Sequence, residues 1–413
     1  MEVKRRKGKG EWEASSHRKE EQRKSKSISL GRPRCKLCLL VTLVSVLLSL
    51  VLIAILPTPI DPVIIDLGGI KSKSFGGNAY LREAIRLFDG EIKGPEGFAI
   101  DGDGNMYTGL HDGRIVLFND THMTTVMRMG PPPYDNCGKL TSESHCGRVL
   151  GLEISQSDPY LLYICDCYHG IQTLHLKTGH REVLVNTTAT YPGVPPIKFS
   201  NDMVVLKNGS VFFTDSSYKF ARNELLMEMY EGRPNGKLLH YNPTDGTVSV
   251  AIGELHFANG VCASKDESFL IISETSRSRI LKYHLKGPKT GQTEIFMNEL
   301  PGVPDNISPS SKPGGGFWIG FALLRNEALE VLGHFPAIRN VFVKLRLTRL
   351  IAESLPRNGL IMECDESGTV IRELYDMGGV KIPSVSEVLD LNGVLYLGSY
   401  DGTYIGKLDF SNK

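Results

Sequence analysis

Short apolar segments that alternate with polar turns make up the chain from residue 81 to its C-terminus. Four stretches each consist of a strand-like run, a turn rich in Gly, Asn or Asp, and a second strand-like run: residues 99–107, 203–215, 261–274 and 388–399. A third strand-like run follows, as at residues 113–117 and 236–241. A hairpin with a third strand and a connecting strand forms one blade of a β-propeller. The pattern therefore predicts an all-β propeller.

Polar motifs recur along this part of the chain at nearly even intervals. Their central residues are Glu96, Asn201, Asn259 and Asp305, which lie 105, 58 and 46 positions apart. These intervals are close to multiples of roughly 50, the length of a propeller repeat. Inner strands are expected to begin near residues 96, 151, 201, 259, 305 and 387. We therefore predict a six-bladed β-propeller over residues 81–413.

The interval before the last inner strand is longer than the others, and residues 321–347 account for the excess. Apolar residues recur there at helical spacing, interrupted by Pro336. They are Leu323, Leu324, Ala328, Leu329, Val331, Leu332, Phe335 and Ile338. We expect a helical insertion before the last blade, on the top face of the propeller. The pattern leaves three roles open: a lid over the channel, a surface that leans on a membrane, or packing against the fifth blade.

Residues 37–56 form a run of twenty residues without charge, in which only Thr42, Ser45 and Ser49 are clearly polar. About twenty apolar residues span a bilayer as a helix. The alternative is a cleaved signal peptide, but its apolar region is usually shorter, and no small-residue cleavage site precedes the following prolines. We therefore predict a transmembrane helix over residues 37–56.

Charge is distributed unevenly along the chain. Residues 1–36 hold thirteen Lys or Arg and five Glu, whereas the remainder is net acidic, which argues against a nucleic-acid partner. The charged segment is expected to be a disordered cytoplasmic tail. The propeller, after a stalk at residues 57–80, then lies in the lumen or outside the cell. The sequence therefore predicts a single-pass type II membrane protein of the plasma membrane or the endoplasmic reticulum. Its anchor is expected to contact lipid.

Features of secreted domains agree with this topology. Cys137 and Cys146 flank a polar loop, where a disulfide would stabilise the fold by roughly 2.5 to 3 kcal/mol. Cys165 and Cys167 share one face of a predicted strand, as buried free thiols or as members of a second bridge. Three asparagines head N-glycosylation triplets: Asn119, Asn186 and Asn208.

The repeated polar residues are also candidate metal ligands. Glu96, Asn201, Asn259 and Asp305 each stand at the start of a predicted inner strand, where a propeller's channel is lined. Two carboxylates and two amide oxygens favour Ca²⁺ over zinc or copper. Asn306 is a further candidate ligand, so its own glycosylation triplet is expected to lack a glycan. The alternative is a hydrogen-bonded polar plug without metal.

Several segments of the chain resemble the strictosidine synthase-like proteins. They are Gly94-Pro95-Glu96, Cys146-Gly147-Arg148, Phe199-Ser200-Asn201-Asp202, Phe212-Phe213-Thr214-Asp215-Ser216-Ser217, Phe257-Ala258-Asn259-Gly260 and Pro301-Gly302-Val303-Pro304-Asp305-Asn306. The resemblance runs from about Tyr80 to the C-terminus. It implies a six-bladed propeller related to paraoxonases, gluconolactonases and phosphotriesterases, with an arylesterase-like hydrolase activity.

Two positions depart from these relatives. Arg148 stands where paraoxonases carry a channel histidine, and Ser386 stands where the plant synthase carries a glutamate, with Glu387 adjacent. The resemblance therefore does not extend to paraoxonase histidine catalysis, and alkaloid condensation is disfavoured.

Together these features predict a calcium-dependent arylesterase or lactonase that acts on a small hydrophobic ester or lactone. The predicted catalytic residues are Asp305, as nucleophile or general base, and Glu387. Weaker candidates are Asp202, Tyr168 and His169. His169 is also explained as a polar turn residue. The alternative is a non-catalytic binding or adhesion ectodomain in which calcium is structural.

Overall fold

The computed structural model describes residues 32–68 and 78–411, so most of the predicted tail lies outside the described residues. The chain divides into two compact units at Pro57. The described part of the first unit is helix α2 (Arg32–Ile55), which covers most of the predicted transmembrane segment. Within the described ranges, no helix is long and apolar enough to cross a membrane, and the predicted anchor stays a prediction.

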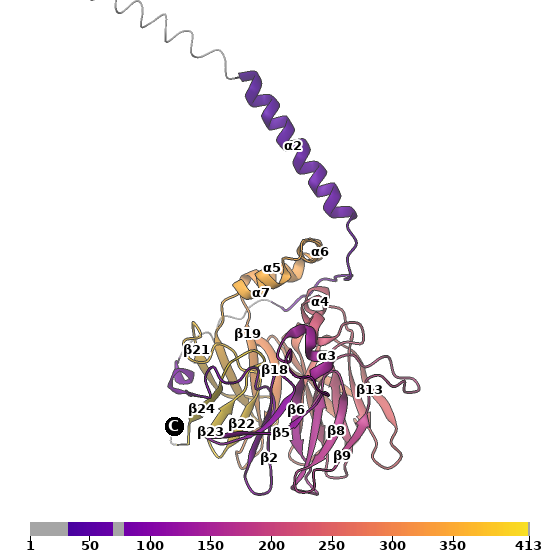
Figure 1. Cartoon of the computed structure of the whole chain (residues 1–413), viewed down its shortest axis with the longest axis vertical. Coiled ribbons are helices and arrows are strands. Elements are labelled where there is room, and N and C mark those ends of the chain that lie inside the picture. Colours follow the sequence, from indigo (N-terminus) through magenta and orange to yellow (C-terminus); the bar gives the residue numbers. More distant parts are fainter. Residues whose placement is uncertain (1–31, 69–77, 412–413) are drawn as a thin grey trace, which may run out of the picture. The chain divides into compact units, whose positions relative to one another are not determined.

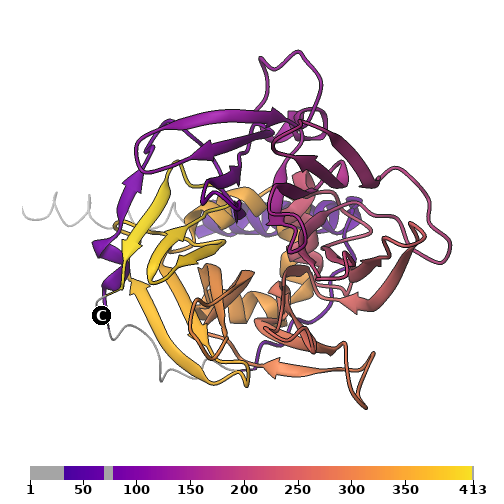
Figure 2. The same ribbon diagram turned by 90° about the horizontal axis from the view of Figure 1, so that it is seen from below.

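The second unit is a ring of six four-stranded antiparallel sheets, which confirms the predicted six-bladed β-propeller (Figure 2). Each sheet contributes one of its edge strands to the inner wall. The inner strands are β2 (Phe98–Ile100), β6 (Val149–Ile154), β10 (Ser200–Val205), β14 (Ala258–Ala263), β18 (Gly302–Pro309) and β22 (Val388–Leu391). Their starts match the positions predicted from the repeated motifs.

The other strands complete the blades in chain order. Blades one to three contain β3 (Met106–Gly109), β4 (Arg114–Phe118), β5 (Met123–Arg128), β7 (Leu161–Asp166), β8 (Gly170–His175), β9 (Arg181–Val185), β11 (Val211–Asp215), β12 (Gly236–Tyr241) and β13 (Val248–Leu255). Blades four to six contain β15 (Phe269–Glu274), β16 (Arg279–His284), β17 (Thr293–Met297), β19 (Phe317–Leu324), β20 (Gly359–Cys364), β21 (Val370–Asp376), β23 (Val394–Leu397) and β24 (Ile405–Asp409). Strand β1 (Ile85–Leu87) pairs with β24, so the beginning and the end of the ring share one sheet.

The apolar core lies between neighbouring blades. One cluster joins Ala99 and Tyr107 of blade one to Leu152 and Ile164 of blade two. Strand β11 is buried along its whole length, because blades pack against both faces of its sheet. Since each blade buries its apolar faces only against its neighbours, the ring is the stable unit.

Helices gather at one end of the ring. Helix α4 (Leu225–Glu231) joins β11 to β12, and α5 (Glu327–His334), α6 (Pro336–Lys344) and α7 (Thr348–Ser354) join β19 to β20. The last three confirm the predicted helical insertion, which lies within blade five. In an antiparallel blade, the connection between the second and third strands is at the same end as the start of the first strand. The helices therefore lie at the end where the inner strands begin.

The helical insertion (α5–α7) reaches across this end of the ring. Helix α6 packs on α4, and Arg339 of α6 donates a hydrogen bond from Nη1 to the Tyr230 carbonyl at 2.7 Å. Figures 1 and 2 show the insertion over the end of the ring and across its central opening. The insertion therefore has the position expected of a cover, one of the three roles left open.

Residues 58–68, part of the predicted stalk, lie against these helices. The Ile60 side chain is buried in a cluster with Phe220 and Val343. The backbone amides of Val63 and Ile65 donate to the carbonyls of Glu231 and Gly333 at 3.0 and 2.9 Å. The chain is thus fixed to the helical end of the propeller at Ile60, Val63 and Ile65.

Two inner strands approach closely at Gly260. A Cβ atom there would lie 2.5 Å from the Asn306 Cα atom, which belongs to the backbone of the next blade. Gly260→Ala is therefore expected to lower the free energy of unfolding by about 1 to 3 kcal/mol, because the two strands must separate. Urea denaturation of both chains measures the difference.

Gly253→Ala is the matched control, since a Cβ atom at Gly253 meets no atom within 4 Å. Equal stability of the two alanine variants would show that the inner strands tolerate the added methyl group.

Candidate functional site

The predicted ligands stand on bulges at the starts of three inner strands. In β10, the pairing with β11 shifts between Ser200 and Met203, and this irregularity contains Asn201. Equivalent shifts in β14 and β18 contain Asn259 and Asp305. A bulge adds a residue to one strand and redirects its side chain. The same local irregularity therefore presents two polar side chains in blades three and five, and one in blade four.

The five predicted ligands are all buried at the channel end of their blades: Glu96, Asn201, Asn259, Asp305 and Asn306. Asn259 Nδ2 donates a hydrogen bond to Asp305 Oδ1 at 2.7 Å, which links blades four and five directly. Asn306 is fixed by its backbone, whose amide donates to the Ser386 carbonyl at 3.0 Å. The structure thus brings ligands of neighbouring blades together.

Four buried carboxylates influence one another in this region. Burial and the charge of Glu96 raise the pKa of Asp305 well above its usual value. Burial raises the pKa of Asp202 to about 7, and Glu96 adds to the shift. Burial, together with the charge of Asp202, raises the pKa of Glu387 to about 8. The inner wall therefore concentrates negative charge that only a proton or another cation can offset.

Amide oxygens beside these carboxylates lack hydrogen-bond partners. Asn201 Oδ1, Asn259 Oδ1 and Asn306 Oδ1 are buried and unpaired, although Asn201 Nδ2 donates to Ser216 Oγ at 2.9 Å. Leaving a buried acceptor unpaired costs about 1 to 3 kcal/mol. A calcium ion accepts carboxylate and amide oxygens together, so these residues fit Ca²⁺. No cluster of three His, Cys, Asp or Glu suited to a metal occurs in the described residues, so the fit depends on the amides.

Arg148 supplies the one cationic group in direct contact with a predicted ligand among the residues described. Its guanidinium is fully buried and donates to Glu96 Oε2, to the Gly94 carbonyl at 2.6 Å and to the Tyr400 carbonyl at 3.1 Å. It joins blades one, two and six and offsets one of the four carboxylates. The sequence predicted only that a histidine is missing here, because the partners of Arg148 lie far away along the chain.

A second polar cluster, which the sequence did not predict, surrounds Glu143. Its Oε1 atom lies 3.0 Å from His111 Nε2 and accepts from Arg222 Nη1 at 2.8 Å, and its Oε2 atom accepts from Tyr168 OH at 3.0 Å. Burial opposes ionisation, but the His111 hydrogen bond and the charge of Arg222 lower the pKa of Glu143 to about 2. The hydroxyl of Tyr168, a weaker catalytic candidate, is therefore engaged in a hydrogen bond within this cluster.

His169, the other weaker candidate, also has a partner of its own. Its Nδ1 atom lies 3.0 Å from Asp166 Oδ1, and this contact raises the pKa of His169. Its backbone amide donates to the same carboxylate at 2.9 Å, as expected of a residue in a turn.

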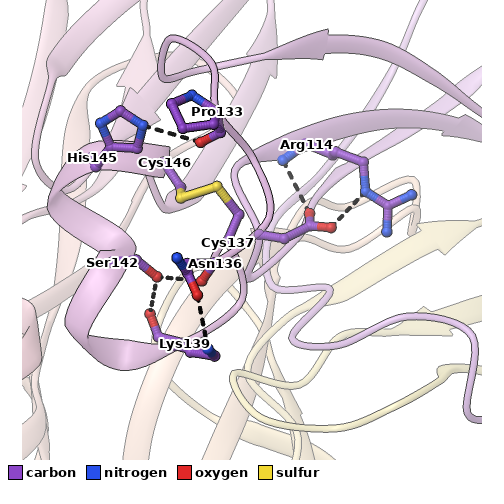
Figure 3. The surroundings of a disulfide bond; sticks show 9 residues. Arg114, Pro133, Asn136, Cys137, Lys139, Ser142, His145 and Cys146 are labelled. Atoms are coloured by element: carbon purple, nitrogen blue, oxygen red, sulfur yellow. Dashed lines mark hydrogen bonds and ion pairs between the residues drawn. A yellow bond between two sulfur atoms is a disulfide. The ribbon is translucent and has the colours of Figure 1, made fainter.

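The predicted disulfide between Cys137 and Cys146 is confirmed, with Cα atoms 5.7 Å apart (Figure 3). Within its loop, Ser142 Oγ donates to the Asn136 carbonyl at 2.6 Å. The bridge ends at α3 (Glu143–Cys146), the helix that carries Glu143. It therefore holds the central carboxylate of the second cluster in place.

The remaining predicted modification sites differ in exposure. Cys165 and Cys167 are buried free thiols, which leaves no second bridge between them. The three predicted glycosylation sites, Asn119, Asn186 and Asn208, are exposed, and their glycans stay a prediction. Asn306 is buried, in keeping with the expectation that it carries none.

Comparisons with known proteins agree with the resemblance found in the sequence. Family models match residues 201–288 (strictosidine synthase) and 74–118 (strictosidine synthase-like, N-terminal). The chain is 34% identical to adipocyte plasma membrane-associated protein of Gallus gallus, over 87% of this chain and 86% of that one. It is 35% identical to the protein of the same name from Salmo salar, over 88% and 87%.

Solved structures also match the propeller. A gluconolactonase of Xanthomonas campestris has a TM-score of 0.52 at 15% identity, covering 86% of this chain and 97% of that one. The calcium-binding protein regucalcin of Agrobacterium tumefaciens has a TM-score of 0.51 at 13% identity, covering 79% and 93%. At these identities the matches establish the fold alone.

Loss of the disulfide is expected to destabilise the propeller. Replacing Cys137 and Cys146 by Ser should lower the free energy of unfolding by roughly 2.5 to 3 kcal/mol, because the unfolded chain is no longer cross-linked. Denaturation with and without reductant measures this. Reductant should destabilise the unsubstituted chain and leave the double variant unchanged; equal effects on both would contradict the prediction.

The raised carboxylate pKa values make the stability of the metal-free chain dependent on pH. The folded state keeps protons that the unfolded state releases, so stability should fall as pH rises from about 4.5 to about 8. Glu387→Gln removes one such group and should flatten the slope, as measured by denaturation across this range. Asp266→Asn is the control, because Asp266 is exposed and its pKa is lowered to about 2. If Glu387→Gln had the same dependence of stability on pH as the unsubstituted chain, the raised pKa assigned to Glu387 would be wrong.

Proposed function

Because the chain belongs to the adipocyte plasma membrane-associated protein family of strictosidine synthase-like propellers, we propose that it is a membrane-anchored, calcium-dependent hydrolase of the arylesterase or lactonase type. The main support is the group of buried carboxylates and unpaired amide oxygens at the inner wall. An uncompensated group of this kind is costly unless a cation binds it.

Five residues would hold Ca²⁺: Glu96, Asn201, Asn259, Asp305 and Asn306. Bound calcium supplies Lewis-acid polarisation of an ester carbonyl and stabilisation of the negative charge that develops on its oxygen. Arg148 keeps Glu96 oriented through its guanidinium.

Asp305 and Glu387 are the residues proposed to act on the substrate. The hydrogen bond from Asn259 orients the Asp305 carboxylate, which can attack directly or accept a proton from water. Burial raises the pKa of Glu387 to about 8, so it can hold or accept a proton near neutral pH. A small hydrophobic ester or lactone is the proposed substrate, in line with the gluconolactonase that shares the fold.

Residues 37–56 are proposed to anchor the chain as a type II membrane protein, with the tail in the cytoplasm and the propeller in the lumen or outside the cell. The support is their lack of charge and the names of the relatives. Either the plasma membrane or the endoplasmic reticulum suits this topology.

One observation favours a second function, a cell-surface binding or adhesion ectodomain with structural calcium. Arg148 replaces the channel histidine of paraoxonases, and its guanidinium is already bonded to Glu96 and to two backbone carbonyls. Arg148 therefore cannot act as the general base that a histidine at this position would provide.

Hydrolysis of aryl acetates and lactones by the full chain, with calcium or with a chelator, separates the two functions. Chelation, Glu96→Gln and Asp305→Asn should each lower turnover about 100-fold or more, because the carbonyl is no longer polarised. Asp245→Asn, at an exposed turn, is the matched control.

Turnover that survives both chelation and the two substitutions would rule out the proposed site. A large fall in melting temperature on chelation, with no substrate turned over, would instead favour the binding ectodomain.

A further inference from the structure

The helical insertion exposes large apolar side chains on its outer face. Five of them define what we call the insertion face: Val331, Phe335, Ile338, Leu345 and Leu350. Val331 is 54% exposed and Leu350 65% exposed. Soluble proteins rarely gather exposed apolar residues in this way without a binding partner.

The opposite face of the insertion already holds it on the propeller. Gly333, Arg339, Val343 and Thr348 are buried there. The apolar residues of the insertion face are therefore not needed for docking on the ring.

A shallow apolar groove of about 490 Å³ continues the insertion face between the three helices. Its lining residues are Glu327, Ala328, Val331, Leu332, Phe342 and Ile351. Exposed arginines, Arg346 and Arg349, stand beside Leu345 and Leu350 in the chain. Apolar side chains flanked by basic ones suit the boundary between lipid headgroups and acyl chains.

The course of the chain points to the same partner. Ile60 is fixed against Val343 of α6. The proposed membrane helix ends at residue 56, and four extended residues cover at most roughly 14 Å. The end of the proposed anchor is thus separated by at most roughly 14 Å of chain from the residue that contacts α6. This step depends on the anchor proposed above.

We propose that the insertion face is a membrane-docking surface, which lies on the phospholipid bilayer that holds the anchor. Its apolar residues would enter the headgroup boundary. Arg346, and the two outer nitrogens of Arg349, whose Nε donates to Glu353 at 2.8 Å, would contact lipid phosphates. The helical insertion would then contact the propeller on one face and the lipid bilayer on the other.

Quenching of tryptophan fluorescence by brominated lipid tests this surface. The full chain is reconstituted into vesicles of phosphatidylcholine with brominated acyl chains and phosphatidylserine, and the signal of the unsubstituted chain is subtracted. Leu350→Trp should lose most of its added fluorescence. Ile295→Trp, on the outer strand of blade four and 53% exposed, is the matched control and should keep its fluorescence.

Flotation of the same vesicles separates this proposal from the anchor. A chain that fails to float would overturn the anchor, and with it the tether on which this surface depends. A chain that floats while Leu350→Trp is quenched no more than Ile295→Trp would overturn the docking surface alone, and is the result expected if the insertion face binds a protein instead.

Discussion

A bulge at the start of three successive inner strands is the feature on which the rest of the site depends. In β10, β14 and β18 it directs polar side chains to the inner wall, and the close approach at Gly260 brings those of blades four and five together. Like charges and unpaired oxygens are thereby forced into one region. The fold is stable only if something offsets this crowding. Arg148 offsets part of it, and the remainder defines what the channel can bind.

Two polar centres thus share the helical end of the ring, and they differ in electrostatic balance. The cluster around Glu143 combines a carboxylate with Arg222 and His111, so its charges are satisfied within the protein. The group around Asp305 has an excess of carboxylates, and burial together with the charge of Glu96 raises the pKa of Asp305. A balanced centre supports structure, whereas an unbalanced one requires a ligand. The disulfide beside Glu143 strengthens this division, since it secures the balanced centre covalently.

The sequence predicted the six blades because the polar motifs mark each inner strand where it begins, and it predicted the bridge between Cys137 and Cys146 because these residues are neighbours along the chain. It missed the partners of Arg148, because Tyr400 lies 252 positions away and no local pattern encodes that contact. The cluster of His111, Glu143 and Arg222 was missed for the same reason. Ile60 was assigned to a stalk, since its burial depends on Val343 in a distant helix. Local periodicity specifies the repeat, whereas contacts between blades require the closed ring.

The pairing of β1 with β24 has a consequence for how the protein is made. Strand β24 (Ile405–Asp409) follows the other strands of the propeller along the chain, so the sixth blade is incomplete until the first five have been synthesised. Until then the earlier blades emerge from the ribosome with an open edge, and Glu96 lacks the neighbours that later surround it. Closure of the ring therefore couples the last strand of the propeller to the site formed at its first blades. The binding site is complete only once the ring has closed.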